Sequence, residues 1–352
     1  MGCVQLTGDP EKDPDTVMIT SADSPRGLAI AEIVLKMEKY KVKALVADPF
    51  SEAAQRLADC GCMVLKGDIS RPQSLWLAMR ACIAVVCLVD PRDSLGKESS
   101  EMNSIVHAVA AKAKEMGVQI FALCTANAIK TDFIEKISDL GFRMARIYRC
   151  TTFCYEDFSQ RFQYEKDAEG KHRMLLRLNL DKKKTFPITC AKEEAEIIVD
   201  AVQDTGKYKK GAIVALEPMN LTIEQYTEIL STATGKDIGY EQIDKATMAK
   251  SPLLPNAEVF AKIFEGYSGS VPELKGVNVV KAKVSFKDWA KENSSMFACR
   301  TVKRAENQES AKMMDDGLLK QMLMASKGAN RELFHTTLES IKRQRSEGKN
   351  LR

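Results

Sequence analysis

Short apolar segments of strand length alternate with longer segments of helical spacing over the first 150 residues. The strand-like segments lie at residues 17–20, 42–48, 62–68, 82–90, 118–125 and 143–149. The helical segments begin at Gly27 and continue at 51–60, 71–81, 98–116 and 131–140. Apolar strands that alternate with helices are typical of a parallel sheet covered on both faces. We therefore predict an α/β fold with a doubly wound, Rossmann-type parallel sheet.

The pattern changes after residue 150 and predicts a smaller α+β lobe. Its expected elements are an aromatic helix at 152–165, a strand at 172–180, and helices at 192–204 and 221–235, the last begun at Thr222 and ended by Gly235. We divide the chain into a flexible N-terminal segment (1–15), a Rossmann-like NAD(P)-binding-type domain (16–150), the lobe (151–297) and a basic helical tail (298–352). The tail keeps apolar positions at helical spacing amid charge, so it either docks on a partner protein or stays solvated.

Charge is unevenly distributed along the chain. The formal net charge is +4, and residues 300–352 hold 12 Lys and Arg against 7 Asp and Glu, a net of +5. The rest of the chain therefore carries about −1, which argues against a nucleic-acid-binding body. No apolar run approaches the roughly 18 residues of a membrane span, and no secretory signal follows the start. We expect a cytoplasmic protein.

The ten cysteines are scattered, mostly through apolar segments, and form no C-x-x-C pair. This distribution is typical of reduced, buried thiols. The three histidines lie far apart in the sequence, without a cysteine or carboxylate pattern around them. We predict no metal site.

The segment VMITSADSPRG, residues 17–27, occupies the place of a dinucleotide-binding glycine loop. In a three-glycine fingerprint the first glycine makes the turn, the second admits the pyrophosphate, and the third packs the helix against the strand. These positions hold Ser21, Ser24 and Gly27. Serine disfavours a positive φ and adds a Cβ, whereas its hydroxyl and the amides of the helix N-terminus still suit a phosphate. We expect weakened binding, with Arg26 either on a phosphate or solvated in the turn.

Several segments together resemble the NmrA-like family, an atypical branch of the short-chain dehydrogenase/reductase fold. They are SADSPRG, VADP, GCMVLKGDI, EMGVQIFALCT and FIEKISDLGFRMARIYRCTTF, and VSFKDWAKENSSMF looks like the family's closing element. The resemblance covers about residues 15–297. It implies a Rossmann fold and a family that ranges from NADP-dependent reductases to regulators that bind dinucleotide without catalysis.

The resemblance assigns two further positions to a dinucleotide site. Ala47 replaces the arginine that NADP-using members carry for the 2′-phosphate. The next residue, Asp48, would accept a hydrogen bond from a ribose hydroxyl, or it simply makes a turn. Gly67 and Asp68 match a Gly-Asp step near the adenine, and a structural turn explains them as well.

The resemblance also locates the catalytic positions. Lys130 stands at the family's lysine position, but the hydroxyl donor expected four residues earlier is Ala126. Because a reductase needs that donor, its absence leaves Thr125, Tyr148 and Tyr155 as substitutes. We predict no catalytic residue. The degenerate dinucleotide site is predicted to comprise Ser21, Ser24, Arg26, Gly27, Asp48, Asp68, Thr125 and Lys130.

The N-terminus, Met-Gly-Cys-Val-Gln, resembles the start of doubly acylated signalling proteins. Myristate on Gly2 alone gives marginal attachment, and palmitate on Cys3 would supply the second chain. Leu6 stands where Ser or Thr is favoured, so an ordinary flexible N-terminus is the alternative. The basic tail would add attraction to anionic lipid or to an acidic protein surface.

These expectations favour a non-catalytic NmrA-like regulatory or scaffolding protein. It would bind NAD(P) weakly or not at all, meet a protein partner through its tail and lobe, and be held at the cytoplasmic face of a membrane if acylated. The alternatives are an NAD(P)-dependent oxidoreductase with a shifted donor and an NADP(H)-binding redox sensor without turnover.

Overall fold

The chain divides into two compact units in its computed structural model, and the first, Met1–Phe297, contains every described residue. The structure describes residues 15–71, 75–93, 97–126, 131–159, 161–166, 172–203, 206–250, 257–266 and 276–297. Gly2 and Cys3, the predicted lipid sites, and the predicted helical tail from residue 298 lie outside these ranges.

Among the described residues, an eight-stranded parallel sheet has the order β14-β11-β6-β5-β4-β1-β2-β3. Its strands are β1 (Asp15–Ile19), β2 (Tyr40–Val46), β3 (Met63–Lys66), β4 (Cys82–Val89), β5 (Ile120–Thr125), β6 (Met144–Arg149), β11 (Ile213–Leu216) and β14 (Asn278–Val280). The chain winds outward in both directions from β1 and β4. The predicted doubly wound, Rossmann-type fold is confirmed.

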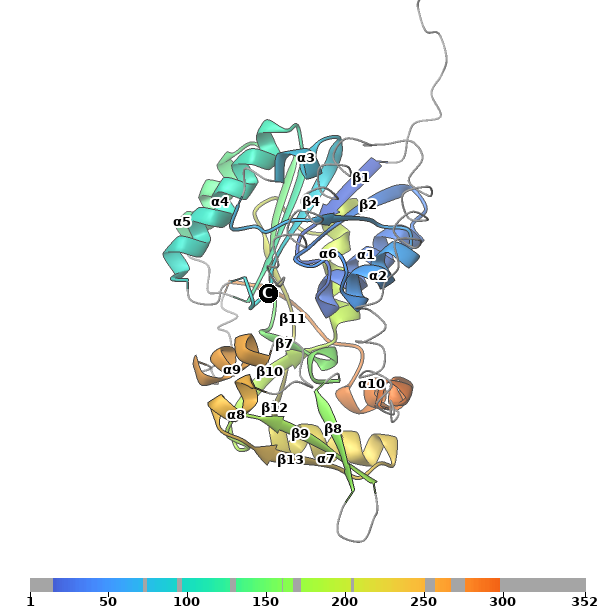
Figure 1. Ribbon diagram of the computed structural model, residues 1–352. Coiled ribbons are helices and arrows are strands. Elements are labelled where there is room, and N and C mark those ends of the chain that lie inside the picture. Colours follow the sequence, from blue (N-terminus) through green and yellow to red (C-terminus); the bar gives the residue numbers. More distant parts are fainter. Residues whose placement is uncertain are drawn as a thin grey trace, which may run out of the picture. The chain divides into compact units, whose positions relative to one another are not determined.

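Helices cover both faces of this sheet (Figure 1). One layer comprises α1 (Pro25–Lys36), α2 (Glu52–Asp59) and α6 (Ala191–Gln203), and the other comprises α3 (Trp76–Met79), α4 (Ser99–Glu115) and α5 (Thr131–Asp139). Each layer forms its own apolar core with the sheet face below it, as the apolar strands predicted. The helix expected at 71–81 is shorter than predicted, because within the described residues only α3 is α-helical there.

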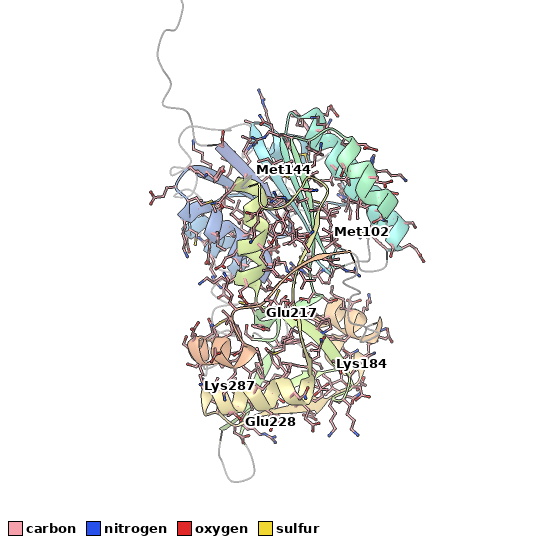
Figure 2. The ribbon with its side chains drawn as sticks, turned by 180° about the vertical axis from the view of Figure 1, so that it is seen from behind. Met102, Met144, Lys184, Glu217, Glu228 and Lys287 are labelled. Atoms are coloured by element: carbon pink, nitrogen blue, oxygen red, sulfur yellow. The ribbon has the colours of Figure 1, made fainter. Side chains whose placement is uncertain are left out.

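The segment beyond residue 150 contributes to both the sheet and the lobe. β11 pairs with β6, and β14 pairs with β11, so these late strands extend the central sheet rather than joining the lobe. Figure 2 labels Met144, at the start of β6, and Glu217, just after β11, at opposite ends of the sheet. Glu228 and Lys287 lie in the lobe, beyond the Glu217 end. The lobe therefore lies at the carboxyl ends of the parallel strands.

In the described part of the lobe, the chain forms two three-stranded sheets and short helices. One sheet contains β12 (Met219–Thr222), β10 (Thr185–Thr189) and β7 (Phe153–Cys154), and the other contains β13 (Ile238–Gln242), β9 (His172–Leu178) and β8 (Phe162–Lys166). The helices are α7 (Ile223–Thr234), α8 (Lys245–Ala249), α9 (Ala257–Gly266), α10 (Phe286–Glu292) and two 3-10 turns, η2 (Tyr155–Phe158) and η3 (Ser294–Phe297). The predicted caps of α7 are confirmed, since Thr222 forms a capping box and Gly235 has φ 66°.

The aromatic helix predicted at 152–165 is wrong. The described part of that segment contains β7, the 3-10 turn η2 and the start of β8. Phe153 instead pairs with Ile188 of β10, and its ring packs against Phe158 at 5.4 Å. The aromatic spacing reflects burial in the lobe's core, which a strand followed by a tight turn satisfies as well as a helix does.

Candidate functional site

The turn between β1 and α1 lies at the switch point of the sheet, where open α/β folds bind ligands. Ser21 occupies this turn with φ 46°, a left-handed conformation that is costly for a residue with a Cβ. The Ser21 carbonyl accepts hydrogen bonds from the Ser24 amide at 3.1 Å and the Ser24 hydroxyl at 2.8 Å. The glycine-like backbone of the turn is therefore kept without the glycine.

Gly27 is the point of closest approach between helix and turn. A Cβ built on it would lie 2.5 Å from the Ser21 carbonyl oxygen and 2.6 Å from Ala22 Cα. Real Cβ atoms essentially never show contacts this short with backbone. The packing role expected for the third glycine is therefore visible in the structure.

The N-terminus of α1 has few amides left for a phosphate. Pro25 has no N–H, and the Gly27 amide donates to Ser24 Oγ at 3.0 Å, while the Leu28 amide makes the first regular helical bond, to the Ser24 carbonyl at 2.9 Å. At most the Arg26 amide remains from the first turn. The expected donors at this helix start are therefore largely absent, because an N-cap serine and a proline satisfy or remove them locally.

A loop that follows β4 closes over the turn from the other side of the switch point. Ser21 Oγ donates to Asp93 Oδ2 at 2.7 Å, and the Asp90 amide donates to the same oxygen at 2.8 Å. Arg92 Nε donates to Asp90 Oδ1 at 2.7 Å, and an Arg92 Nη2 atom lies 3.6 Å from Asp23 Oδ1. Three carboxylates and one guanidinium thus occupy the place where the fold would present hydrogen-bond donors to a pyrophosphate.

Burial changes the charge of this carboxylate group. Desolvation, with repulsion from Asp90, raises the pKa of Asp93 to about 6 against the hydrogen bond from Ser21. Desolvation also raises the pKa of Asp23, although Arg92 opposes it. An environment that already disfavours its own carboxylates disfavours an added phosphate more. The residues present therefore do not fit a dinucleotide pyrophosphate at this turn.

We expect an Asp93→Asn variant to gain about 1 kcal/mol of stability relative to wild type when the pH is raised from 5 to 7. Asparagine keeps an oxygen for Ser21 and Asp90 but cannot ionise. The Asp93 pKa is raised from 3.8 to about 6 by folding, so its stabilising contribution is full below pH 4 and is lost as the pH rises through 6. Urea unfolding of both proteins at the two pH values measures the difference, and a pH-independent difference would contradict the assignment.

Arg26 takes neither of the two predicted environments. Its side chain is 4% exposed, and its Nε atom donates to Glu194 of α6 in a buried ion pair. An Arg26 Nη2 atom also donates to the Thr151 carbonyl at 2.8 Å. Arg26 therefore joins α1 to α6 and to the segment that leaves β6, and it is neither a phosphate ligand nor a solvated turn residue. No residue near Arg26 in the sequence predicts its pairing with Glu194, which lies 168 residues later.

The remaining predicted binding residues are turn-formers or lie apart. Asp48 Oδ1 accepts from the Phe50 amide at 3.0 Å, and Asp68 Oδ1 accepts from the Ser70 amide at 2.8 Å. Both are exposed at the carboxyl ends of β2 and β3, where they form turns, one of the two roles predicted for them.

The hollow bordered by Ser24, Arg26 and Asp90 has room for about one water molecule.

The candidate proton donors named from the sequence are buried where the structure describes them. Lys130 lies outside the described residues, and Ala126, which directly follows β5, has no donor on its side chain. Thr125 is 4% exposed, at the end of that strand. Tyr148 is 2% exposed with no partner for its hydroxyl, and burial strongly raises its pKa. Tyr155 is 1% exposed with its ring 5.0 Å from Phe286 in the lobe core, and burial raises its pKa too.

Cysteine and histidine form no candidate metal centre within the described ranges. Of the eight cysteines described there, all are free thiols, and Cys60 alone among them is exposed. Burial raises the pKa of Cys62 to about 11 and of Cys87 to about 12. Thiols with raised pKa values are weak nucleophiles and weak metal ligands.

Comparison with known proteins agrees with this fold. The NmrA-like family model matches residues 13–133. An NmrA-like family domain-containing protein from Dictyostelium discoideum is 23% identical over 272 residues, which cover 72% of this chain and 88% of the relative.

Solved structures show the same fold at low identity. The negative transcriptional regulator NmrA, in complex with NADP, is 14% identical and superimposes with a TM-score of 0.55 over 81% of this chain and 97% of its own. Triphenylmethane reductase from Citrobacter sp. is 16% identical, with a TM-score of 0.52 over 80% of this chain and 99% of its own. The same reductase is also known complexed with NADP(H). The neighbours thus include a regulator and an enzyme, and the chain is similar to the NmrA-like family over residues 13–133, the first part of its Rossmann-type sheet.

Proposed function

We propose that this protein is a non-catalytic, NmrA-like regulatory or scaffolding module that binds NAD(P) weakly or not at all. The observation that carries the proposal is the bond from Ser21 Oγ to Asp93 Oδ2, 2.7 Å long, which ties the former glycine turn to the loop after β4. Ligand-binding Rossmann proteins keep this gap open for a pyrophosphate. Here the chain fills it with its own hydroxyl and carboxylates.

The loss of donors supports the same conclusion independently. A pyrophosphate at a helix N-terminus is held by free amides and the helix dipole. Ser24 Oγ takes the Gly27 amide, and Pro25 has no amide hydrogen to donate. The family's lysine, Lys130, also lacks its hydroxyl donor, since Ala126 stands four residues before it. Both substrate-side and cofactor-side groups of a reductase are therefore replaced.

The oxidoreductase alternative requires a donor such as Thr125 or Tyr155. Tyr155 is buried against Phe286 and Trp289 at 5.0 and 5.5 Å, so its hydroxyl has no route to a nicotinamide without unpacking the lobe. Thr125 is 4% exposed at the end of β5, and a threonine hydroxyl is too weak an acid to serve as a proton donor unless it is activated. These observations favour the non-catalytic proposal over the enzyme.

We expect no saturable binding of NAD, NADH, NADP or NADPH in the micromolar range by titration calorimetry. Micromolar affinity for any of the four would overturn the closed-turn proposal. The non-catalytic proposal is tested by incubating the protein with NADPH and a pool of cell metabolites. Consumption of NADPH that the Lys130→Ala substitution abolishes would overturn that proposal.

A gain-of-binding variant tests the physical reason. Ser21→Gly with Asp93→Asn removes the bond across the gap and one negative charge, and we expect NADPH affinity to rise about tenfold or more. Asp59→Asn is the matched control, since Asp59 is exposed at the far end of α2 and loses the same charge. Equal gains in both variants would assign the effect to net charge rather than to the turn.

We propose further that myristate on Gly2 and palmitate on Cys3 hold the protein at the cytoplasmic face of a membrane. No helix in the described part of the chain is long and apolar enough to cross a bilayer. Two acyl chains give the stable attachment that one does not. The tether is tested by metabolic labelling with both fatty acids and by the location of a Gly2→Ala variant in cells.

The tail and the lobe are the proposed surfaces for a protein partner. The partner is to be sought by cross-linking in cells that express the chain with and without residues 298–352.

A further inference from the structure

The amino ends of the sheet strands carry a dense cluster of lysines, opposite the edge where Ser21 and Asp93 meet. The cluster, named here the lysine face, comprises Lys36, Lys39, Lys41, Lys207, Lys209 and Lys210. All six are exposed. Lys36 ends α1, Lys39 follows it and Lys41 lies near the start of β2, while the other three lie in the connection from α6 to β11.

Contacts between α1 and α6 bring the two groups of lysines together. Tyr40 Oη donates to the Val202 carbonyl at 3.2 Å, and Gln203 Nε2 lies 3.4 Å from Met37 Sδ. These contacts join the two chain segments where each helix ends. The lysines that follow them along the chain therefore share one surface.

The lysine face is held in place by buried groups. Arg146, 0% exposed, donates to Asp200 at 2.6 Å and to the Tyr208 carbonyl at 2.7 Å, which fixes the loop between α6 and β11. The Nζ atom of Lys207 lies over the Tyr208 ring, 5.3 Å from its centroid. Lys39 lies over the Tyr40 ring in the same way, at 5.0 Å. These cation–π contacts hold both lysines beside the neighbouring rings.

The N-terminal segment enters the fold at this surface. In the register of the sheet, Asp15 pairs with Tyr40 and Thr16 pairs with Lys41. The 14 residues before Asp15 can span at most about 50 Å when fully extended. An acyl group on Gly2 or Cys3 would therefore keep the lysine face within that distance of the bilayer. The acidic residues described on the α1 side of this surface are Asp15 and Glu38.

We propose that the lysine face docks on an anionic lipid bilayer. The positive charge of the lysine face contrasts with residues 1–299 as a whole, which carry a net charge of about −1. The opposite edge of the sheet holds Asp23, Asp90 and Asp93. The proposal rests on the membrane attachment proposed above for its acyl anchor, and it adds the orientation. The acidic edge and the lobe then face away from the membrane.

Vesicle sedimentation with the full chain tests the face apart from the tether. The probes are vesicles of phosphatidylcholine alone and of phosphatidylcholine mixed with phosphatidylserine. We expect unacylated protein to bind the mixed vesicles selectively, and the binding to fall as salt screens the charges. Each lysine near the surface changes partition roughly fivefold, so replacing Lys207, Lys209 and Lys210 with glutamine should lower it about 100-fold.

The control replaces Lys182, Lys183 and Lys184, which lie between β9 and β10 in the lobe, with glutamine. Figure 2 shows Lys184 in the lobe, far from Met144 at the amino end of β6. The same charge is lost there, so we expect the control to bind mixed vesicles as wild type does. Equal losses in both variants, or no selective binding by wild type, would overturn the docking face. Binding of an acidic peptide or RNA through these lysines at salt that abolishes vesicle binding would overturn it too.

Acylation is varied separately by preparing the chain with and without N-myristoyltransferase. Selective binding without myristoylation, lost in the Lys207, Lys209 and Lys210 variant, supports the face even where no acyl group is incorporated in cells. In that case the acylation proposal is overturned and the proposal that the lysine face docks on the bilayer is retained. Circular dichroism melting of each variant verifies that the fold is retained.

Discussion

Replacing Arg26 with methionine is expected to lower the free energy of unfolding by about 3 to 5 kcal/mol. Arg26 and Glu194 are each 4% exposed and paired, so the substitution leaves a carboxylate buried without its cation. The Arg26 guanidinium also satisfies the Thr151 carbonyl at 2.8 Å, which would lose that donor. Urea denaturation followed by fluorescence or circular dichroism gives the difference between the variant and wild type.

Two further variants separate the buried charge from the lost contacts. With Glu194→Leu added, no buried charge remains, and most of the stability should return. Lys262→Met is the matched surface control, because Lys262 and Glu258 form an ion pair at 2.8 Å with side chains 48% and 70% exposed. We expect it to cost less than about 1 kcal/mol. A cost for Arg26→Met no larger than for Lys262→Met would show that Glu194 is not held by this arginine.

Arg26 also illustrates why part of the site escaped prediction. Its role depends on a glutamate 168 residues later, brought to it when α6 packs on α1. The Ser21 to Asp93 bond likewise joins residues 72 positions apart. No local pattern encodes such pairs, because a charged residue after a turn is usually solvated. The motif VDPRD after β4 was a possible signal, since it places three charges at the switch point of a predicted sheet.

Local features were predicted more successfully. The apolar strands fixed the fold class because strands buried on both faces have few alternatives. The cap at Thr222 and the stop at Gly235 were predictable because each depends on backbone within one turn. The segment 152–165 failed because its aromatic residues, such as Phe153 and Phe158, are selected by the lobe core rather than by helical spacing. The pairing of β11 with β6 in the central sheet was not predicted, because strand order depends on the fold of the whole chain.

Gly27→Ala is expected to destabilise the protein by about 3 kcal/mol, against the direction that helix propensity predicts. Alanine is favoured over glycine in helices by about 1 kcal/mol. The added Cβ, however, would lie 2.5 to 2.8 Å from three backbone atoms of Ser21 and Ala22, which cannot rotate away as a side chain can. Urea unfolding of the variant measures the sign as well as the size of the change.

The sign of that change decides whether the turn is held rigidly. If the turn yields, Ser21 moves with its bond to Asp93, and the variant is as stable as wild type or more so. If the turn holds, helix α1 is pushed away and the core around Ile30 and Val34 loses packing. Gly117→Ala is the control for backbone strain alone, because Gly117 has φ 82° and no atom near its added Cβ. We expect that control to cost about 1 kcal/mol. A larger loss at Gly27, despite its helical backbone, would assign the effect to the contact between helix α1 and the turn at Ser21 and Ala22.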